Sequence, residues 1–180
     1  VRSALITAMI RALVEELRPL AHEPGQFMTK LNSDLFAILQ HAGSPVLTTA
    51  FYLVADATTG RMRYANAGHP KPLRLHRVNG KVEPLKSAAR TSQPALGLFE
   101  HAAYHSSEVL LAARDLLMLF TDGLYEVHAA DDQIYTQEML TSAVKRHQHL
   151  PAPELFDALL REIGEYATDH AFDDDVCIVG

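Results

Sequence analysis

The spacing of hydrophobic residues changes twice along this 180-residue chain, and these changes constrain its fold more than any other feature. Before residue 43, apolar residues recur every three or four positions, which is typical of amphipathic helices. Between residues 46 and 120 they form short runs rich in Val, Tyr, Phe and Thr, with turn sequences between them, as β-strands do. Helical spacing returns from residue 136, and a last apolar run covers residues 176–179. This order of helices, antiparallel strands, helices and a final strand predicts an α+β fold.

Proline, glycine and asparagine mark where the predicted elements begin and end. Pro19 ends the first helix, and Pro24 suits the first turn of the second. Residues 56–60 and the Asn-Gly pair at 79–80 are typical turns, so the strands around them should form hairpins of an antiparallel meander. We expect helices over residues 3–17, 24–43, 136–146 and 153–166. We expect strands over residues 47–55, 61–65, 73–77, 81–85, 104–111, 116–120 and 176–179.

The composition, with 48% hydrophobic and 21% charged residues, is that of one globular domain, which we expect to occupy residues 1–180. The formal net charge of -6 argues against a nucleic-acid partner, because a phosphate backbone requires a basic surface. No apolar run reaches the roughly 18 residues that span a bilayer, so we expect no membrane contact in this segment. The sole cysteine, Cys177, excludes an internal disulfide and lies in an apolar run that predicts burial. A cytoplasmic location fits this cysteine content best.

Two acidic positions stand beside predicted strands. The stretch LMLFTDGLYEV, residues 117–127, ends an apolar run on Asp122, and the three aspartates at residues 173–175 precede the last apolar run. One interpretation is an Asx turn at Asp122 and a solvated turn at 173–175. The other is that the two sites meet at one edge of a sheet, where converging carboxylates typically hold a hard cation such as Mg²⁺ or Mn²⁺. The residues alone leave both interpretations open.

Four ordered motifs extend along essentially the whole chain. They are TAFYLVADATTGRMRYANAGHPKPL at residues 49–73, LGLF at 96–99, ARDLLMLFTDGLYE at 113–126 and DDDVCIV at 173–179. In this order they resemble the metal-dependent, PPM-type serine/threonine protein phosphatases. The resemblance is to the bacterial branch that includes the stage II sporulation E protein and RsbU-like regulators.

This resemblance implies an α-β-β-α four-layer sandwich of antiparallel sheets flanked by helices, with a binuclear Mn²⁺ or Mg²⁺ site at one edge. Asp122 matches one metal-binding aspartate of the family and Asp174 matches another, while Asp175 takes that role if the register shifts by one residue. The family hydrolyses phosphate esters with metal-activated water, so Asp122 and Asp174 are also the expected catalytic residues. Cys177 stands where the family usually has threonine.

The family's bridging aspartate lies in an Asp-x-x-Gly-His-Gly segment just before the stretch that this chain resembles. The chain is therefore expected to be the C-terminal portion of the domain and to have weak or no activity alone. The resemblance also implies a sensor or receiver domain upstream. Strands that lack their usual neighbours expose edges that invite pairing, which predicts a homodimer.

Two functions of different classes follow from these residues. The first is a phosphatase domain acting on phosphoserine or phosphothreonine of a regulatory protein, such as an anti-sigma-factor antagonist. The alternative is a noncatalytic phosphatase-like module that binds a regulatory partner. His69 is interpreted either as a phosphate-contacting group or as part of a structural turn at residues 66–70. An unrelated α+β domain would require all four motif matches to be coincidental.

Overall fold

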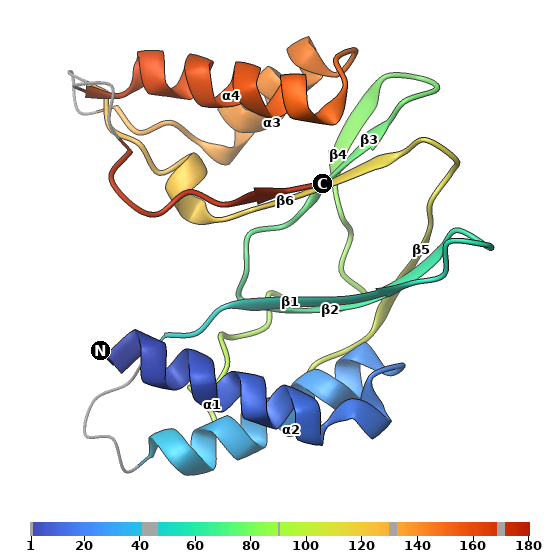
Figure 1. The fold of residues 1–180 in the computed structure, drawn as a ribbon, viewed down its shortest axis with the longest axis vertical. Helices are drawn as coiled ribbons and strands as arrows, with labels where there is room; N and C mark the ends of the chain where they lie inside the picture. The colour runs from blue at the N-terminus through green and yellow to red at the C-terminus, as the bar shows by residue number, and fades with distance from the viewer. Residues whose placement is uncertain (1, 41–46, 90, 130–132, 169–171) are drawn as a thin grey trace. The chain divides into compact units, whose positions relative to one another are not determined.

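The strands of the computed structural model form two antiparallel sheets, one in each of two units (Figure 1). One unit comprises Val1–His69 and Lys86–Leu111, and the other comprises Pro70–Leu85 and Ala112–Gly180. The structure describes residues 2–40, 47–89, 91–129, 133–168 and 172–180. Each unit is thus assembled from two stretches that are separate in the sequence.

In the first unit, helices pack against a three-stranded sheet of order β1-β2-β5. The rings of Phe27 and Tyr52 stack with their centroids 4.2 Å apart, which joins the second helix to the sheet. Leu35 is buried in the same cluster as Ala65 and Ala67, whose small side chains allow the helix to approach closely. The elements are α1 (Arg2–Glu16), η1 (Arg18–Leu20), α2 (Pro24–Leu39), β1 (Ala50–Ala55), β2 (Arg61–Ala67) and β5 (Ser107–Leu110).

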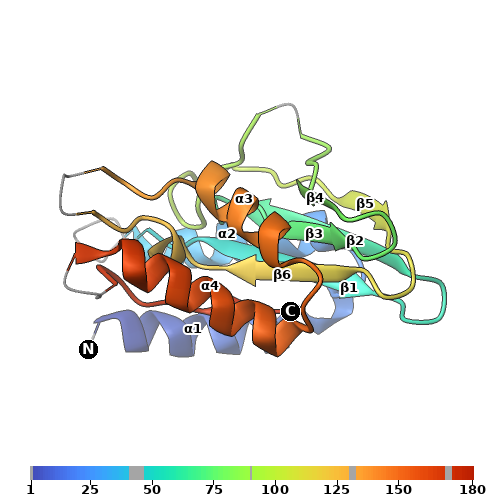
Figure 2. The same ribbon diagram turned by 90° about the horizontal axis from the view of Figure 1, so that it is seen from above.

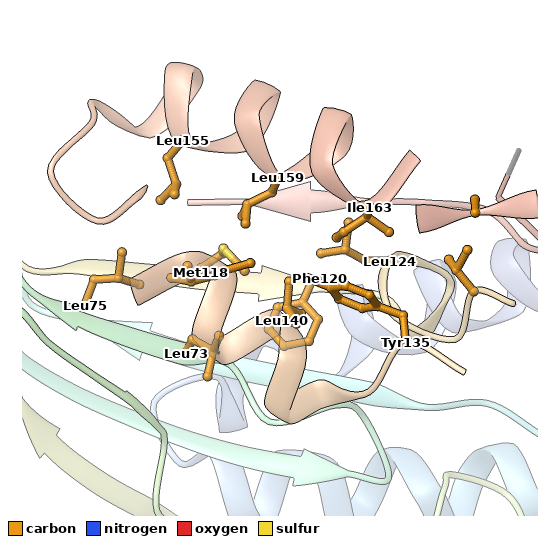
Figure 3. Close-up of a cluster of buried hydrophobic side chains, with 14 residues drawn as sticks. Leu73, Leu75, Met118, Phe120, Leu124, Tyr135, Leu140, Leu155, Leu159 and Ile163 are labelled. Carbon is orange, nitrogen blue, oxygen red and sulfur yellow. The ribbon is translucent and has the colours of Figure 1, made fainter. Parts of the chain in front are cut away.

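In the second unit, two helices pack on a sheet of order β4-β3-β6-β7 (Figure 2). Leu155, Leu159 and Ile163 lie on the face of the last helix that meets Met118 and Phe120 (Figure 3). Full burial of each such side chain contributes about 1.5–3 kcal/mol. The elements are β3 (Leu73–His76), β4 (Lys81–Pro84), β6 (Leu116–Phe120), η2 (Asp122–Leu124), α3 (Gln137–His147), α4 (Ala152–Tyr166) and β7 (Ile178–Val179).

The predicted helices are confirmed, with the observed boundaries of α1, α3 and α4 within one residue of those expected. Helix α2 begins at Pro24 as predicted, whereas the predicted end at Gly43 lies outside the described residues. A helix with the length and apolar character needed to cross a bilayer does not occur among the described residues.

Three predicted strands begin two or three residues later than expected, at residues 50, 107 and 178. The strand expected from residue 104 begins only at Ser107, because the preceding backbone bonds to side chains and not to a neighbouring strand. Tyr104 N donates to Thr29 Oγ1 at 2.9 Å, and His105 N donates to Gln93 Oε1 at 3.3 Å. The strand expected from residue 47 begins at Ala50, after an isolated bridge between Thr48 and Leu96.

The prediction of a simple meander is wrong, although all pairings between the named strands are antiparallel. Strand β2 pairs with β1 and β5, whereas β3 pairs with β4 and β6 in the other sheet. The two hairpins, β1-β2 and β3-β4, form as expected from their turns. The chain leaves the first sheet after β2 because residues 66–70 make a turn of their own.

The interpretation of Cys177 as a buried residue is also wrong, because this thiol is exposed. Strand β7 covers only Ile178 and Val179 and lies at the edge of its sheet. Ile178 is partly buried in the core cluster while Val179 is exposed. Cys177 thus follows the alternation of an edge strand that has one face toward solvent.

Asn32 is the one buried polar residue of α2 that the structure describes, and it fixes the loop before β5. Its Nδ2 donates to Phe99 O at 2.9 Å, and its Oδ1 accepts from Gly97 N at 2.9 Å. Gly97 has a φ of +75° and would bring a Cβ to 2.9 Å from Leu39 Cδ1. Asn32 therefore satisfies a partly buried backbone donor and acceptor of this loop.

We predict that Asn32→Ala lowers the free energy of unfolding by about 1–2 kcal/mol, because it leaves these partly buried backbone groups without their partners. Urea titration followed by circular dichroism measures the change. Asn79→Ala is the control, since the exposed Asn79 accepts only a turn bond from Lys81 N at 3.0 Å. Equal destabilisation by the two substitutions would show that the burial of Asn32 contributes nothing.

Candidate functional site

The two acidic positions are brought together by the pairing of β6 with β7. Leu119 pairs with Val179 and Phe120 with Ile178, so the end of β6 lies beside the start of β7. The ladder continues by one bond, from Thr121 N to Cys177 O at 3.1 Å. Asp122 lies two residues after the end of β6, and residues 173–175 lie three to five residues before the start of β7. The expected meeting of the two acidic loops at one sheet edge is therefore what the structure shows.

The side chain of Thr121 connects the two loops. Its Oγ1 donates to Asp175 O at 3.0 Å and accepts from Cys177 N at 2.9 Å. One hydroxyl thus satisfies a carbonyl and an amide on the opposite loop, on either side of Val176. This role of Thr121 was not predicted from the sequence, where its only local signal is a hydrogen-bonding residue placed immediately before Asp122.

Gly123 permits the close approach of the same loops. A Cβ at this residue would lie 2.7 Å from Asp175 O, closer than real Cβ contacts, and 3.1 Å from Asp174 O, which is a tight contact. Asp122 and Gly123 do not form a hairpin turn but begin the 3-10 helix η2, in which Asp122 Oδ1 accepts from Gly123 N at 3.1 Å. The glycine is therefore required by packing against the acidic loop and not by a positive φ.

The three aspartates before β7 differ in their surroundings. Asp173 Oδ2 accepts from the backbone N of His128 at 3.2 Å and lies 2.9 Å from its Nδ1. The hydrogen bonds from the ring and the backbone of His128 lower the pKa of the Asp173 carboxyl. Asp174 Oδ1 accepts from Asp175 N at 2.7 Å, which leaves its second oxygen for other contacts. Asp173 is thus committed to His128, whereas Asp174 and Asp175 are exposed beside Asp122.

The electrostatic surroundings of Asp122 are negative. Burial, together with the charges of Glu126 and Asp122, raises the pKa of the Tyr125 hydroxyl. Asp122 and Asp174 present carboxylate oxygens, the donors that Mg²⁺ and Mn²⁺ prefer. Among the described residues, no group of three or more His, Cys, Asp or Glu side chains is placed to hold a metal ion. The two carboxylates therefore fit a hard cation in the chemistry of their oxygen donors.

Residues 66–70 form a structural turn in the first unit. Asn66 Nδ2 donates to His69 O at 2.9 Å, and Asn66 Oδ1 accepts from His69 N at 2.8 Å. Gly68 adopts a φ of +70°, which favours glycine. The His69 ring lies 6.3 Å from that of Phe51, centroid to centroid. These contacts account for the motif as a turn closed by the side chain of Asn66.

Comparison with known sequences gives a match over the whole chain. The family model described as Stage II sporulation protein E (SpoIIE) matches residues 1–180. The phosphoserine phosphatase RsbP of Bacillus subtilis is 27% identical over 180 residues, which is 99% of this chain and 42% of RsbP. Protein IcfG of Synechocystis is 23% identical, over 81% of this chain and 22% of IcfG. The chain therefore spans less than half the length of these relatives.

Solved structures resemble this fold closely. The SiaA-PP2C domain of Pseudomonas aeruginosa matches with a TM-score of 0.80 at 21% identity, over 99% of this chain and 69% of that one. The structure of the RsbU and RsbW domains of Rv1364c from Mycobacterium tuberculosis matches with a TM-score of 0.66 at 18% identity, over 97% and 46%. The SpoIIE phosphatase domain of Bacillus subtilis, in a crystal form without domain swapping, gives 0.65 at 15% identity, over 99% and 73%.

These likenesses confirm the predicted fold class of antiparallel sheets with packed helices, as found in PP2C-type phosphatase domains. The similarity that the four sequence motifs indicated therefore also holds for the arrangement of the strands. On the match of the family model to every position, this chain belongs to the stage II sporulation protein E (SpoIIE) family of PP2C-like serine phosphatases.

Proposed function

We propose that this chain is the metal-binding part of a protein phosphatase that hydrolyses phosphoserine or phosphothreonine on a regulatory protein. The observation that carries the proposal is the pair of hydrogen bonds through which Thr121 Oγ1 holds the loop of residues 173–175 beside Asp122. A merely solvated acidic turn does not need a buried glycine and a shared hydroxyl to hold it against a second carboxylate. Family membership and the likeness to a phosphoserine phosphatase support the same function.

In this proposal Asp122 and Asp174 hold Mn²⁺ or Mg²⁺ at the edge of the second sheet. Asp175 is the neighbouring candidate, because its carboxylate is exposed on the same loop. When bound, the cations lower the pKa of water and neutralise charge on the phosphoryl group. Thr121 and Gly123 act as positioning residues, since they set the spacing of the two loops. A bridging aspartate from the family's Asp-x-x-Gly-His-Gly segment would complete the ligand set, because two carboxylates alone hold a hard cation weakly.

The proposed partner is a phosphorylated regulatory protein, such as an anti-sigma-factor antagonist. A sensor or receiver domain is proposed for the remaining length, because the chain spans only 42% of RsbP. Homodimerisation is proposed through unpaired strand edges, since β1 and β4 are outer strands of their sheets.

A noncatalytic module that binds a regulatory partner is the second candidate. It is favoured by one observation, the lack of a group of three metal-ligating side chains among the described residues. The two candidates differ in whether the carboxylates of Asp122 and Asp174 are needed for phosphate release.

We predict that Asp122→Asn and Asp174→Asn each lower Mn²⁺-dependent phosphate release from a phosphoserine protein by at least about a hundredfold, because changes next to metal ligands already cost 10–100-fold. The assay uses the full-length protein and measures released phosphate against Mn²⁺ concentration. Asp157→Asn is the matched control, since Asp157 is exposed in α4 away from the site and should retain full activity. Unchanged activity in both Asp122→Asn and Asp174→Asn would refute the metal role, and no activity in the unsubstituted protein would favour the binding module.

We predict that Thr121→Val weakens Mn²⁺ binding by about ten- to hundredfold, because a residue that positions metal ligands changes affinity by this amount. Valine keeps the shape of threonine but cannot bond to Asp175 O and Cys177 N. Thr121→Ser keeps the hydroxyl and should restore most of the affinity. Calorimetric titration with Mn²⁺ gives the dissociation constants, and equal affinity of the valine and serine variants would show that the hydroxyl has no such role.

A further inference from the structure

A cavity of about 710 Å³ lies in the second unit, at the end of β6 opposite to Asp122. Its lining comes from the turn between β3 and β4, the turn that precedes β6, and the connection between α3 and α4. Arg77, Val78, Arg114, His149 and Leu150 are among the lining residues. The volume lies in the range of roughly 300–1,000 Å³ that is typical of small-molecule sites.

The ionisable groups of this cavity are all basic. Arg77, Arg114 and His149 line it, and no Asp or Glu is found among its described lining residues. The nearest acidic residue along the α3–α4 connection is Glu154, which is exposed in the first turn of α4 and is not part of the lining. The whole chain has a formal net charge of -6, so this concentration of cationic side chains runs against its composition. A concave basic surface favours an anionic ligand.

Arg77 is held in place by the protein and keeps donors for a ligand. One guanidinium nitrogen, Nη1, donates to Gln148 O and to Leu150 O, the latter at 2.8 Å. A guanidinium group carries five N–H donors, and these two bonds use only the Nη1 group. Arg77 is therefore fixed on the cavity wall with its other nitrogens not engaged by these bonds.

Arg114 occupies a backbone position that normally suits glycine. Its φ is +72°, and it is the third residue of a turn closed by the bond from Asp115 N to Ala112 O at 3.1 Å. The neighbouring Asp115 does not neutralise it, because Asp115 Oδ2 accepts from Arg74 Nε at 2.8 Å. Within the described residues, no hydrogen bond or ion pair of the Arg114 side chain is found. Residues in such strained backbone conformations are found preferentially at functional sites, including sites that bind ligands.

We propose that this cavity binds a phosphate-bearing small molecule through Arg77, Arg114 and His149. Arginine forks match the geometry of phosphate oxygens, and two of them with an imidazole suit a ligand of more than one negative charge. Val78 and Leu150 offer apolar surface to an organic part of the ligand. This site is separate from the proposed metal edge and does not depend on phosphatase activity.

The test is calorimetric titration of the purified protein with pyrophosphate and, separately, with a nucleoside diphosphate. EDTA is present throughout, so that no cation at Asp122 contributes to phosphate binding. Both probes carry the same diphosphate group, so equal affinity assigns the site to free polyphosphate. Tighter binding of the nucleoside diphosphate assigns it to nucleotides, with the apolar wall as the additional contact. No binding of either probe at millimolar concentration overturns the proposal.

Three variants test the residues. Arg114→Gln should weaken binding of the better probe by about tenfold, the loss expected for one charge-assisted contact. Arg114→Gly should weaken it as much without lowering the thermal unfolding midpoint, because glycine tolerates the positive φ. Arg161→Gln is the matched control, since it removes the same charge from an exposed position on α4 outside the cavity. Equal affinity of Arg114→Gln and the unsubstituted protein, or an equal loss with Arg161→Gln, overturns the assignment.

Discussion

The hydrogen bonds of Thr121 decide where the acidic loop before β7 lies. Strand β7 contributes only two residues, and its ladder with β6 has two residue pairs, which is little to fix a loop at a sheet edge. Thr121 extends that ladder with its backbone N and adds two bonds through its hydroxyl. Gly123 then lets the backbone of Asp174 and Asp175 approach to a distance at which any side chain would clash. The proximity of Asp122 to Asp174 follows from these two neighbours of Asp122 more than from the aspartates themselves.

Features set by local sequence could be predicted, whereas those set by distant contacts could not. Pro24 opens α2, Thr136 caps α3 through Met139 N, and Asp56 closes its turn through Thr58 N at 2.8 Å. Each of these depends on residues within a few positions of one another. The second neighbour of β2, in contrast, is β5. The alternation of residues along either strand does not specify this pairing. The prediction of a simple meander was wrong because a hairpin turn defines only one neighbour of each strand and leaves its second neighbour undetermined.

The candidate site shows the same division. Asp122 and Asp174 were identified from ordered motifs, and their loops do meet. The contribution of Thr121 was missed because its partners lie more than 50 residues away, where no spacing rule applies. The exposure of Cys177, in contrast, could have been predicted from its immediate neighbours in the sequence. Val176 and Ile178 are partly buried while Cys177 and Val179 are exposed, so the run alternates as a half-buried edge strand does.

Strand β6 separates opposite charges at its two ends. Arg114 precedes it beside Arg77 and His149, and Asp122 follows it beside Asp174. Five residues of extended chain span about 17 Å, roughly twice the Debye length of about 8 Å at physiological ionic strength. The electrostatic interaction between the basic cavity and the acidic edge is therefore weak. A cation bound at one end would change the affinity for an anion at the other end only slightly. Between the two ends, Met118 and Phe120 of β6 are buried in the core cluster that includes residues of α4. An anion in the basic cavity could thus influence the proposed metal edge only by moving β6 or the loops at its ends, and not by charge alone.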